Sequence, residues 1–330
     1  MDGISVIICC YNSAKRIPET LKHLSQQQIL TYFPWEIILV NNNSNDTTVE
    51  VATQEWQSYN SNVLFKILNV PEPGKSYAIK AGVFEAKYKY SIICDDDNWL
   101  SPDYLQIAFE IMESNSQIGM LGGQGIAACE INPPEWFENK KSDYAVGKQG
   151  LESGDITSRY YLWGAGVVFR TDILFQIYNS GIKSLLTCRK GNELTSGGDS
   201  EISAWFILVG YKLWYDSRLI FRHYIPKERL TEDYVNRLQE GFDLASVKLI
   251  YYNKLIKYEQ LTLHGKFCLL IKSLLKIIFA YIIPKRYKSL YSENLLNIQL
   301  ISAGKIFFNA DMAVVQNMIR IPLKKLKIRQ

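Results

Sequence analysis

Residues 90–98 read Tyr-Ser-Ile-Ile-Cys-Asp-Asp-Asp-Asn, an apolar run followed by three consecutive aspartates. A short run of this kind is typical of a strand buried on both faces. Three adjacent carboxylates repel one another unless a cation neutralises them, and carboxylate oxygens favour Mg²⁺ or Mn²⁺. The triplet therefore predicts a divalent-cation site at a strand end. An acidic helix cap is the alternative, because Ser101 and Pro102 predict a helix start just beyond it.

The chain before this stretch alternates between strand and helix patterns. The predicted strands are residues 4–9, 36–40 and 63–68, and the predicted helices are about 14–28, 47–59 and 75–86. Tandem units of this kind imply an α/β fold with a parallel sheet and right-handed crossovers. Ligands bind beyond the carboxyl ends of such strands. The polar clusters after the first, second and fourth strands all fall at that edge, where we expect the binding site.

The end of the chain is strongly basic. Residues 264–330 carry twelve Lys or Arg and two Asp or Glu, a net +10, so residues 1–263 carry −6 of the total +4. Residues 266–283 are the most apolar stretch, but Lys272 and Lys276 interrupt it, and a spanning helix needs roughly 20 apolar residues. A helix lying in an anionic membrane surface fits this pattern, with a helix packed on the protein as the alternative. No nucleic-acid motif accompanies the charge, so nucleic acid is not expected as a partner.

Cysteine usage and the first residues bear on the compartment. The six cysteines form no CxxC pair, and Cys9, Cys10 and Cys94 lie in apolar strand-like runs. Free thiols of this kind indicate a reducing environment. Residues 1–12 lack the basic segment and cleavage site of a signal peptide. We therefore expect a cytoplasmic protein that is peripheral on the inner face of the cell membrane.

Three linked motifs resemble those of family 2 glycosyltransferases of the bacterial surface-polysaccharide type. They are SVIICCYN at 5–12, EIILVNNNSNDT at 36–47 and CDDDN at 94–98, and their order and spacing match that family. The resemblance covers roughly residues 3–230. It implies the GT-A fold, in which a Rossmann-like, mostly parallel sheet is flanked by helices, here with a helical C-terminal extension. Residues 1–230 would form the glycosyltransferase domain, with a nucleotide-sugar half at about 1–100 and an acceptor half at about 101–230. Residues 231–330 would form a basic, amphipathic helical region.

The resemblance also implies a donor site. The loop Cys10-Tyr11-Asn12 would pack against the nucleotide base. Asn41 stands where the family usually has an aspartate that binds the uracil edge; asparagine offers both a donor and an acceptor, so UDP remains the expected nucleotide. Trp136 could stack on a sugar, although packing is the favoured interpretation. The other candidates for the donor site are Asn43, Lys75, Lys80, Asp95, Asp96, Gly164, Ala165 and Arg229.

Metal binding and catalysis are assigned in the same way. The aspartate triplet matches the family's DxD motif, which makes Asp97 the expected ligand of Mg²⁺ or Mn²⁺, together with Asp95 and His223. Residues 196–201 read SGGDSE and match the family's acidic motif, with glycine in place of its first acid. Asp199 is the predicted general base and Glu201 the runner-up. An ordinary acidic helix start is the alternative interpretation of both carboxylates.

These observations predict a metal-dependent, inverting glycosyltransferase. It would move a sugar from a nucleoside-diphosphate sugar, expected to be a UDP-sugar, to a hydroxyl of a saccharide or lipid-linked saccharide in cell-surface polysaccharide synthesis. One alternative is a non-catalytic, membrane-associated subunit that binds nucleotide sugars. A sugar nucleotidyltransferase is less favoured, because the loop after the first strand, Cys-Tyr-Asn-Ser-Ala-Lys, lacks the Gly-rich, basic character that a triphosphate requires.

Overall fold

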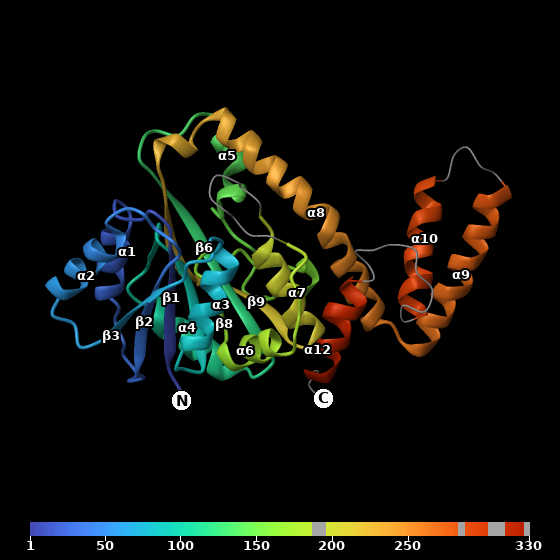
Figure 1. Ribbon diagram of the computed structural model, residues 1–330, viewed down its shortest axis with the longest axis horizontal. Helices are drawn as coiled ribbons and strands as arrows, with labels where there is room; N and C mark the ends of the chain where they lie inside the picture. The colour runs from blue at the N-terminus through green and yellow to red at the C-terminus, as the bar shows by residue number, and fades with distance from the viewer. Residues whose placement is uncertain (187–195, 283–287, 303–313, 327–330) are drawn as a thin grey trace.

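The computed structural model describes residues 1–186, 196–282, 288–302 and 314–326 (Figure 1). Within them, a nine-stranded sheet has the order β3-β2-β1-β4-β8-β6-β9-β5, with β7 paired to β9. The strands are β1 (Ile4–Cys10), β2 (Trp35–Asn41), β3 (Leu64–Asn69), β4 (Tyr90–Asp95), β5 (Asn98–Leu100), β6 (Ile118–Cys129), β7 (Gly154–Asp155), β8 (Val168–Arg170) and β9 (Lys212–Ile225).

Helices flank the sheet on both faces. In the first part of the chain they are α1 (Ile17–Ser25), α2 (Thr48–Ser58), α3 (Lys75–Glu85), α4 (Tyr104–Ser114), α5 (Phe137–Lys140), α6 (Thr171–Asn179) and α7 (Gly198–Leu208). The C-terminal ones are α8 (Glu232–Gln260), α9 (Leu263–Ile282), α10 (Lys288–Ile301) and α12 (Ile321–Leu326). Short helices η1 (Lys141–Tyr144), η2 (Thr157–Arg159), η3 (Lys227–Arg229) and η4 (Val315–Arg320) connect them.

The first half of the sheet is parallel, as predicted. Strand β1 pairs in parallel with β2 and β4, and β2 pairs in parallel with β3. Alternate residues of β1 enter different cores: Ile7 packs with α3, α6 and α7, and Ile8 with α1, α2 and α4. Both side chains are fully buried. This two-sided burial explains the continuous apolar runs in these strands.

The second half of the sheet is mixed rather than mostly parallel. Strand β8 runs antiparallel to both β4 and β6, and β5 runs antiparallel to β9, whereas β6 and β9 are parallel. For β5 the physical reason is the connection: β5 begins three residues after β4, which leaves no room for a helical crossover. The same short strand separates the aspartate triplet from α4, so the helix-cap interpretation of the triplet is wrong.

The C-terminal helices begin with α8 at Glu232. Helix α8 lies across the first domain, and its Tyr252 and Leu255 are buried in the same core as α6 and α7 (Figure 1). Helices α9 and α10 form a hairpin that projects from the body of the molecule, joined by an Asn297–Ser273 hydrogen bond of 3.3 Å. The predicted interfacial stretch falls on α9, except that its last residue, 283, lies outside the described residues. No helix in the described part of the chain has the length and hydropathy needed to cross a membrane.

Candidate functional site

A cavity of about 1100 Å³ opens at the carboxyl ends of β1 and β4. Its walls come from the loops after these strands, the start of α3, residues 159–165, the start of α7 and the inner face of α8. The site thus lies at the sheet edge that the sequence predicts. Helix α8 adds a wall from the C-terminal region, so the cavity is not confined to residues 1–230.

Each aspartate of the triplet has a different basic partner on the cavity wall. Lys75 Nζ lies 2.5 Å from Asp95 Oδ1, and Arg229 Nη1 lies 2.8 Å from Asp97 Oδ2. Arg16 donates to Asp96 Oδ2 from Nη2 at 2.6 Å. Asp96 and Asp97 are buried. The repulsion that argued for a metal is therefore balanced one charge at a time by side chains of the protein itself.

His223 faces Asp97 because β5 and β9 pair in a fixed register that sets Asn98 opposite His223. His223 Nε2 lies 3.5 Å from Asp97 Oδ1, and its Nδ1 lies 2.6 Å from the carbonyl oxygen of Tyr144. Burial raises the pKa of Asp97, but His223 and Arg229 outweigh it and hold that pKa well below its usual range. Asp97 is therefore an ionised acceptor at the bottom of the cavity.

This arrangement fits a divalent cation in part. The backbone carbonyl of Tyr144 that contacts His223 Nδ1 is a usual second partner of a metal-binding histidine. When the ring is neutral and Nδ1 donates to that carbonyl, the lone pair of Nε2 is on the side of Asp97. Asp95 is paired with Lys75 instead, and the described residues contain no group of three His, Cys, Asp or Glu able to hold a metal. Asp97 and His223 could hold Mg²⁺ or Mn²⁺ only with phosphate oxygens and water as further ligands, which is the common arrangement for Mg²⁺.

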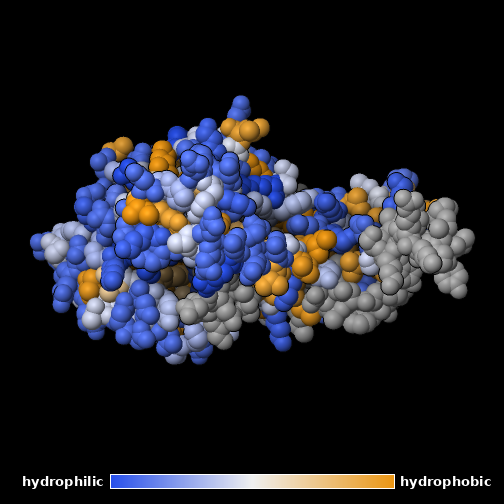
Figure 2. Space-filling view, turned by 90° about the horizontal axis from the view of Figure 1, so that it is seen from above, coloured by the Kyte–Doolittle hydropathy of each residue, from blue (hydrophilic) through white to orange (hydrophobic). Residues whose placement is uncertain are grey.

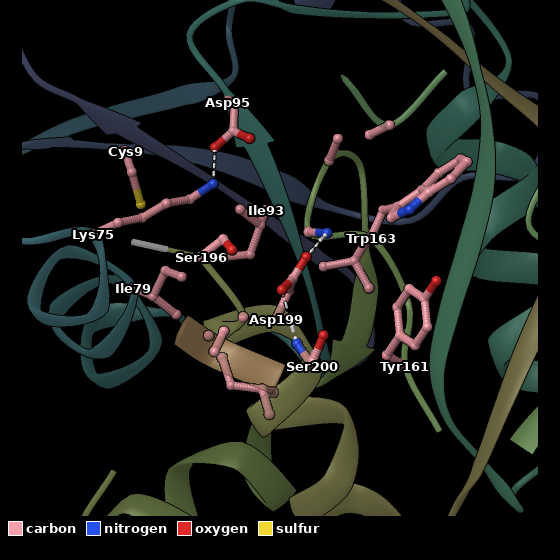
Figure 3. Close-up of a pocket in the computed structure, with 18 of the residues that line it drawn as sticks. Cys9, Lys75, Ile79, Ile93, Asp95, Tyr161, Trp163, Ser196, Asp199 and Ser200 are labelled. Atoms are coloured by element: carbon pink, nitrogen blue, oxygen red, sulfur yellow. Dashed lines mark hydrogen bonds and ion pairs between the residues drawn. The ribbon is translucent and has the colours of Figure 1, made fainter. Parts of the chain in front are cut away.

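Asp199 lies on the cavity wall at the start of α7. Its Oδ2 accepts from the Gly164 amide at 3.0 Å and its Oδ1 from the Ser200 amide at 2.8 Å. Gly197, just before it, has a φ of +95°, which favours glycine and allows the sharp entry into the helix. Figure 3 shows the carboxylate between two groups of cavity residues: Lys75 and Asp95 on one side, and Tyr161 and Trp163 on the other.

Glu201, the runner-up base, does not line the cavity. Glu201 lies two residues after Asp199 in α7, so it is on another side of the helix. Its side chain is buried there. It accepts hydrogen bonds from Tyr252 Oη at 2.6 Å, from the Leu185 amide at 2.6 Å and from Ser184 Oγ. Burial raises its pKa. Its contacts join α7 to α8 and to the loop after α6, which is a structural role.

The other predicted donor residues divide into two sets. Asn12, Asn41 and Lys80 do not line the cavity formed by the described residues. Asn41 bonds Asn69 and the Ser44 amide, Asn12 accepts from the Asn45 amide, and Lys80 Nζ lies 5.6 Å from the centre of the Phe84 ring. The structure places the following predicted residues on the cavity wall: Cys10, Tyr11, Asn43, Lys75, Asp95, Asp96, Asp97, Gly164, Ala165, Asp199, His223 and Arg229.

Sequence reasoning missed several residues of the wall. Arg16 pairs with Asp96, and Arg159, Tyr160 and Tyr161 line the side near Asp199. Arg16 follows the first strand-end loop closely, and that position is the one signal that could have indicated it. Trp136, in contrast, packs against Phe137 outside the cavity lining, with ring centres 6.3 Å apart.

Comparison with known proteins identifies the family. The model described as glycosyl transferase family 2 matches residues 5–173. Poly-beta-1,6-N-acetyl-D-glucosamine synthase of Staphylococcus epidermidis is 28% identical over 124 residues, 37% of this chain and 28% of the relative. Dolichyl-phosphate beta-glucosyltransferase ALG5D of Trichomonas vaginalis is 36% identical over 100 residues, 28% of this chain and 30% of the relative. The matches thus span less than a third of these relatives.

Solved structures agree on the fold. TarS 1-349 of S. aureus in complex with UDP superposes with a TM-score of 0.53 and 14% identity, covering 98% of this chain and 89% of that one. Its complex with UDP-GlcNAc gives a TM-score of 0.52, with 99% and 93% covered at 14% identity. Family match, motif order and sheet topology lead to one conclusion: the chain belongs to glycosyl transferase family 2 and has the GT-A fold.

Proposed function

We propose that this glycosyltransferase moves a sugar from a UDP-sugar to a hydroxyl of a saccharide or lipid-linked saccharide, in the synthesis of a cell-surface polysaccharide. The observation that carries the proposal is the shared cavity, which is lined both by Asp199 and by the cationic and acidic groups around Asp97. The UDP and UDP-GlcNAc complexes of TarS, and the poly-N-acetylglucosamine synthase among the relatives, support the choice of donor and pathway class.

In this mechanism, Lys75 and Arg229 bind the diphosphate and stabilise the charge that develops on it as it leaves. Asp97 and His223 would hold Mg²⁺ or Mn²⁺, which would supply further positive charge at the leaving group. Asp199 accepts the proton of the acceptor hydroxyl as that oxygen attacks the anomeric carbon. Its two backbone hydrogen bonds fix the carboxylate for this task. One displacement from the far side of the sugar inverts the anomeric centre.

The direct test follows release of nucleoside diphosphate from a panel of UDP-, GDP- and dTDP-sugars, with Mn²⁺, with Mg²⁺ and with a chelator. We expect release from a UDP-sugar that is fastest with one of the two cations. Tight UDP binding with no release from any donor would contradict catalysis of this kind, and full activity in chelator would contradict the role of the metal.

A substitution tests the metal ligand separately. Asp97→Asn keeps the shape that Arg229 and His223 contact but removes the negative charge that a cation needs. We expect activity to require much higher Mn²⁺, or to be lost. Because the change also removes the charge that Arg229 pairs with, the thermal unfolding midpoint should fall, and the Mn²⁺ dependence is measured well below that midpoint. An Asp97→Asn enzyme with an unchanged Mn²⁺ dependence would contradict the assignment.

A further inference from the structure

An aromatic group lines the cavity on the side of Asp199 that faces away from Lys75 and Asp95 (Figure 3). It consists of Tyr161 and Trp163, with Arg159 beside them. The guanidinium carbon of Arg159 lies 4.3 Å from the centre of the Tyr161 ring and 5.1 Å from that of Trp163. One cation thus lies over both rings, and both rings line the cavity.

The backbone holds this group in a fixed position. Arg159 Nη1 donates to the Gln149 carbonyl oxygen at 2.6 Å, and the Trp163 amide donates to Gln149 Oε1 at 2.8 Å. Gln149 is itself buried and bonds the Gly123 carbonyl at 3.0 Å. Tyr160, which follows Arg159 and precedes Tyr161 in the sequence, has a φ of +69°. Residues other than glycine adopt this backbone conformation at a cost in free energy. A strained turn kept by several hydrogen bonds at a cavity wall indicates a functional constraint on the direction of the rings.

The same segment is joined to the proposed base. Gly164 follows Trp163 directly, and its amide is the group that donates to Asp199 Oδ2. The backbone that carries Trp163 therefore lies beside that carboxylate, and the rings and the carboxylate line one cavity. The phosphate-binding cations Lys75 and Arg229 belong to other segments of the wall, so the aromatic group is not needed to hold the diphosphate.

Ring faces next to a carboxylate suit a particular chemistry. A pyranose has an apolar face of C–H groups and an edge of hydroxyls, so it packs against an aromatic ring while its hydroxyls bond to polar groups nearby. We propose that Tyr161 and Trp163 form the acceptor subsite, where the terminal sugar of a saccharide acceptor stacks with a hydroxyl directed at Asp199. This inference rests on the proposed function and specifies its acceptor: the reacting hydroxyl belongs to a pyranose ring.

Saturation-transfer NMR on the 330-residue chain, saturated with UDP and Mn²⁺, provides the test. The probes are the methyl glycosides of glucose, galactose and N-acetylglucosamine. We expect transfer to the ring C–H protons of at least one glycoside. Trp163→Ala and Tyr161→Ala should each weaken that binding roughly 3- to 10-fold, the scale of one aromatic contact, whereas Trp163→Phe should restore most of it. Trp136→Ala, a tryptophan outside the cavity lining, is the matched control.

Binding of UDP by each variant reports whether the fold and the donor half survive. Glycoside binding that is equal in wild type, Trp163→Ala and Tyr161→Ala would overturn the proposal. So would the absence of transfer to every glycoside in the UDP-saturated wild type. In both cases, continued release of UDP from a UDP-sugar would show that the acceptor subsite is wrongly placed, while the proposed function would still hold.

Discussion

Single residues in this protein show how little a residue type reveals without its neighbours. Asp199 and Glu201 stand two positions apart in one helix, and both resemble the acids of the family motif. Asp199 lines the cavity and is held by backbone amides, while Glu201 is buried beneath Tyr252. Helical geometry, which turns the chain by about 100° per residue, separates the two roles.

Asp199→Asn should lower the turnover number about 10²- to 10⁴-fold, the usual contribution of a general base, because the amide cannot accept the acceptor's proton. Affinity for UDP should be retained. Turnover and UDP binding are measured on the same preparations. Asp172→Asn is the control, since Asp172 also lies in the first turn of a helix but is exposed. Near-normal turnover in Asp199→Asn would exclude it as the base.

The buried carboxyl of Glu201 leads us to predict how the stability of the protein depends on pH. Burial raises its pKa, although hydrogen bonds from Ser184 and Tyr252 lower it in part. The folded protein therefore holds this proton more tightly than the unfolded chain, whose glutamates titrate near pH 4.3. The stabilisation is fully present below about pH 4.3 and is lost as the pH rises through the folded pKa.

Glu201→Gln should consequently flatten the decline in the free energy of unfolding above about pH 4.3. Urea titrations over a series of pH values measure it. Glu240→Gln, exposed on α8, should leave the slope unchanged. An unaltered slope in Glu201→Gln, or a Glu201→Gln enzyme that is inactive but normally stable, would contradict the structural role assigned to this carboxylate.

Among the elements, α9 has the most unusual surface. Phe267, Ile271, Leu275 and Ile278 are exposed at helical spacing, so they form one apolar stripe. Lys272 and Lys276 are also exposed and lie on another side of the helix. Figure 2 shows further hydrophobic side chains breaking the hydrophilic surface toward the C-terminal side of the molecule. We propose that α9 lies on an anionic membrane surface, at the inner face of the cell membrane.

Phe267→Glu with Leu275→Glu should weaken binding to vesicles of phosphatidylcholine and phosphatidylglycerol roughly tenfold or more, because each such side chain contributes about 1.5–3 kcal/mol when it leaves water. Cosedimentation measures the affinity. Leu30→Glu with Tyr32→Glu removes an apolar pair elsewhere that is even more exposed, and it should have no effect. Vesicle binding that is absent in the wild type, or equal in both double variants, would contradict the membrane role of α9.

At the scale of the whole molecule, the C-terminal region and the first 230 residues share one core. Helix α8 contributes Tyr252, Leu255 and Ile256 to the cluster that also contains α6 and α7, and η4 and α12 add Ile319 and Leu323. Arg320 bonds Glu259 at 2.7 Å across these helices. The division predicted at residue 230 is therefore not a division between independently packed units.

A fragment of residues 1–230 should accordingly fail to give a cooperative, soluble fold, because it would expose the face that α8 covers. Near-UV circular dichroism and thermal unfolding compare it with the full chain. A fragment of residues 1–262, which keeps α8, should retain more native signal. A 1–230 fragment with a sharp transition and full UDP binding would show that α8 is dispensable for the fold.

Much of this protein was determined locally, by its sequence. Apolar, β-branched runs buried on both faces fix β1, β2 and β4, and the polar residues that follow them predict the edge at which the cavity opens. The motifs in these segments also indicate the family correctly. Such features are readable because the periodicity and the turn chemistry depend on neighbours in the chain.

Tertiary structure decided the pairing of charges and the composition of the walls. Asp97 meets His223 only because β5 and β9 share a register, and Asp96 meets Arg16 across 80 positions of sequence. The mixed half of the sheet, the burial of Glu201 and the wall that α8 adds to the cavity also depend on contacts between distant segments. The types of residue in the sequence, and the spacing between them, indicate which chemistry is available. Which groups come within hydrogen-bonding distance is set by packing, and packing is a property of the whole chain.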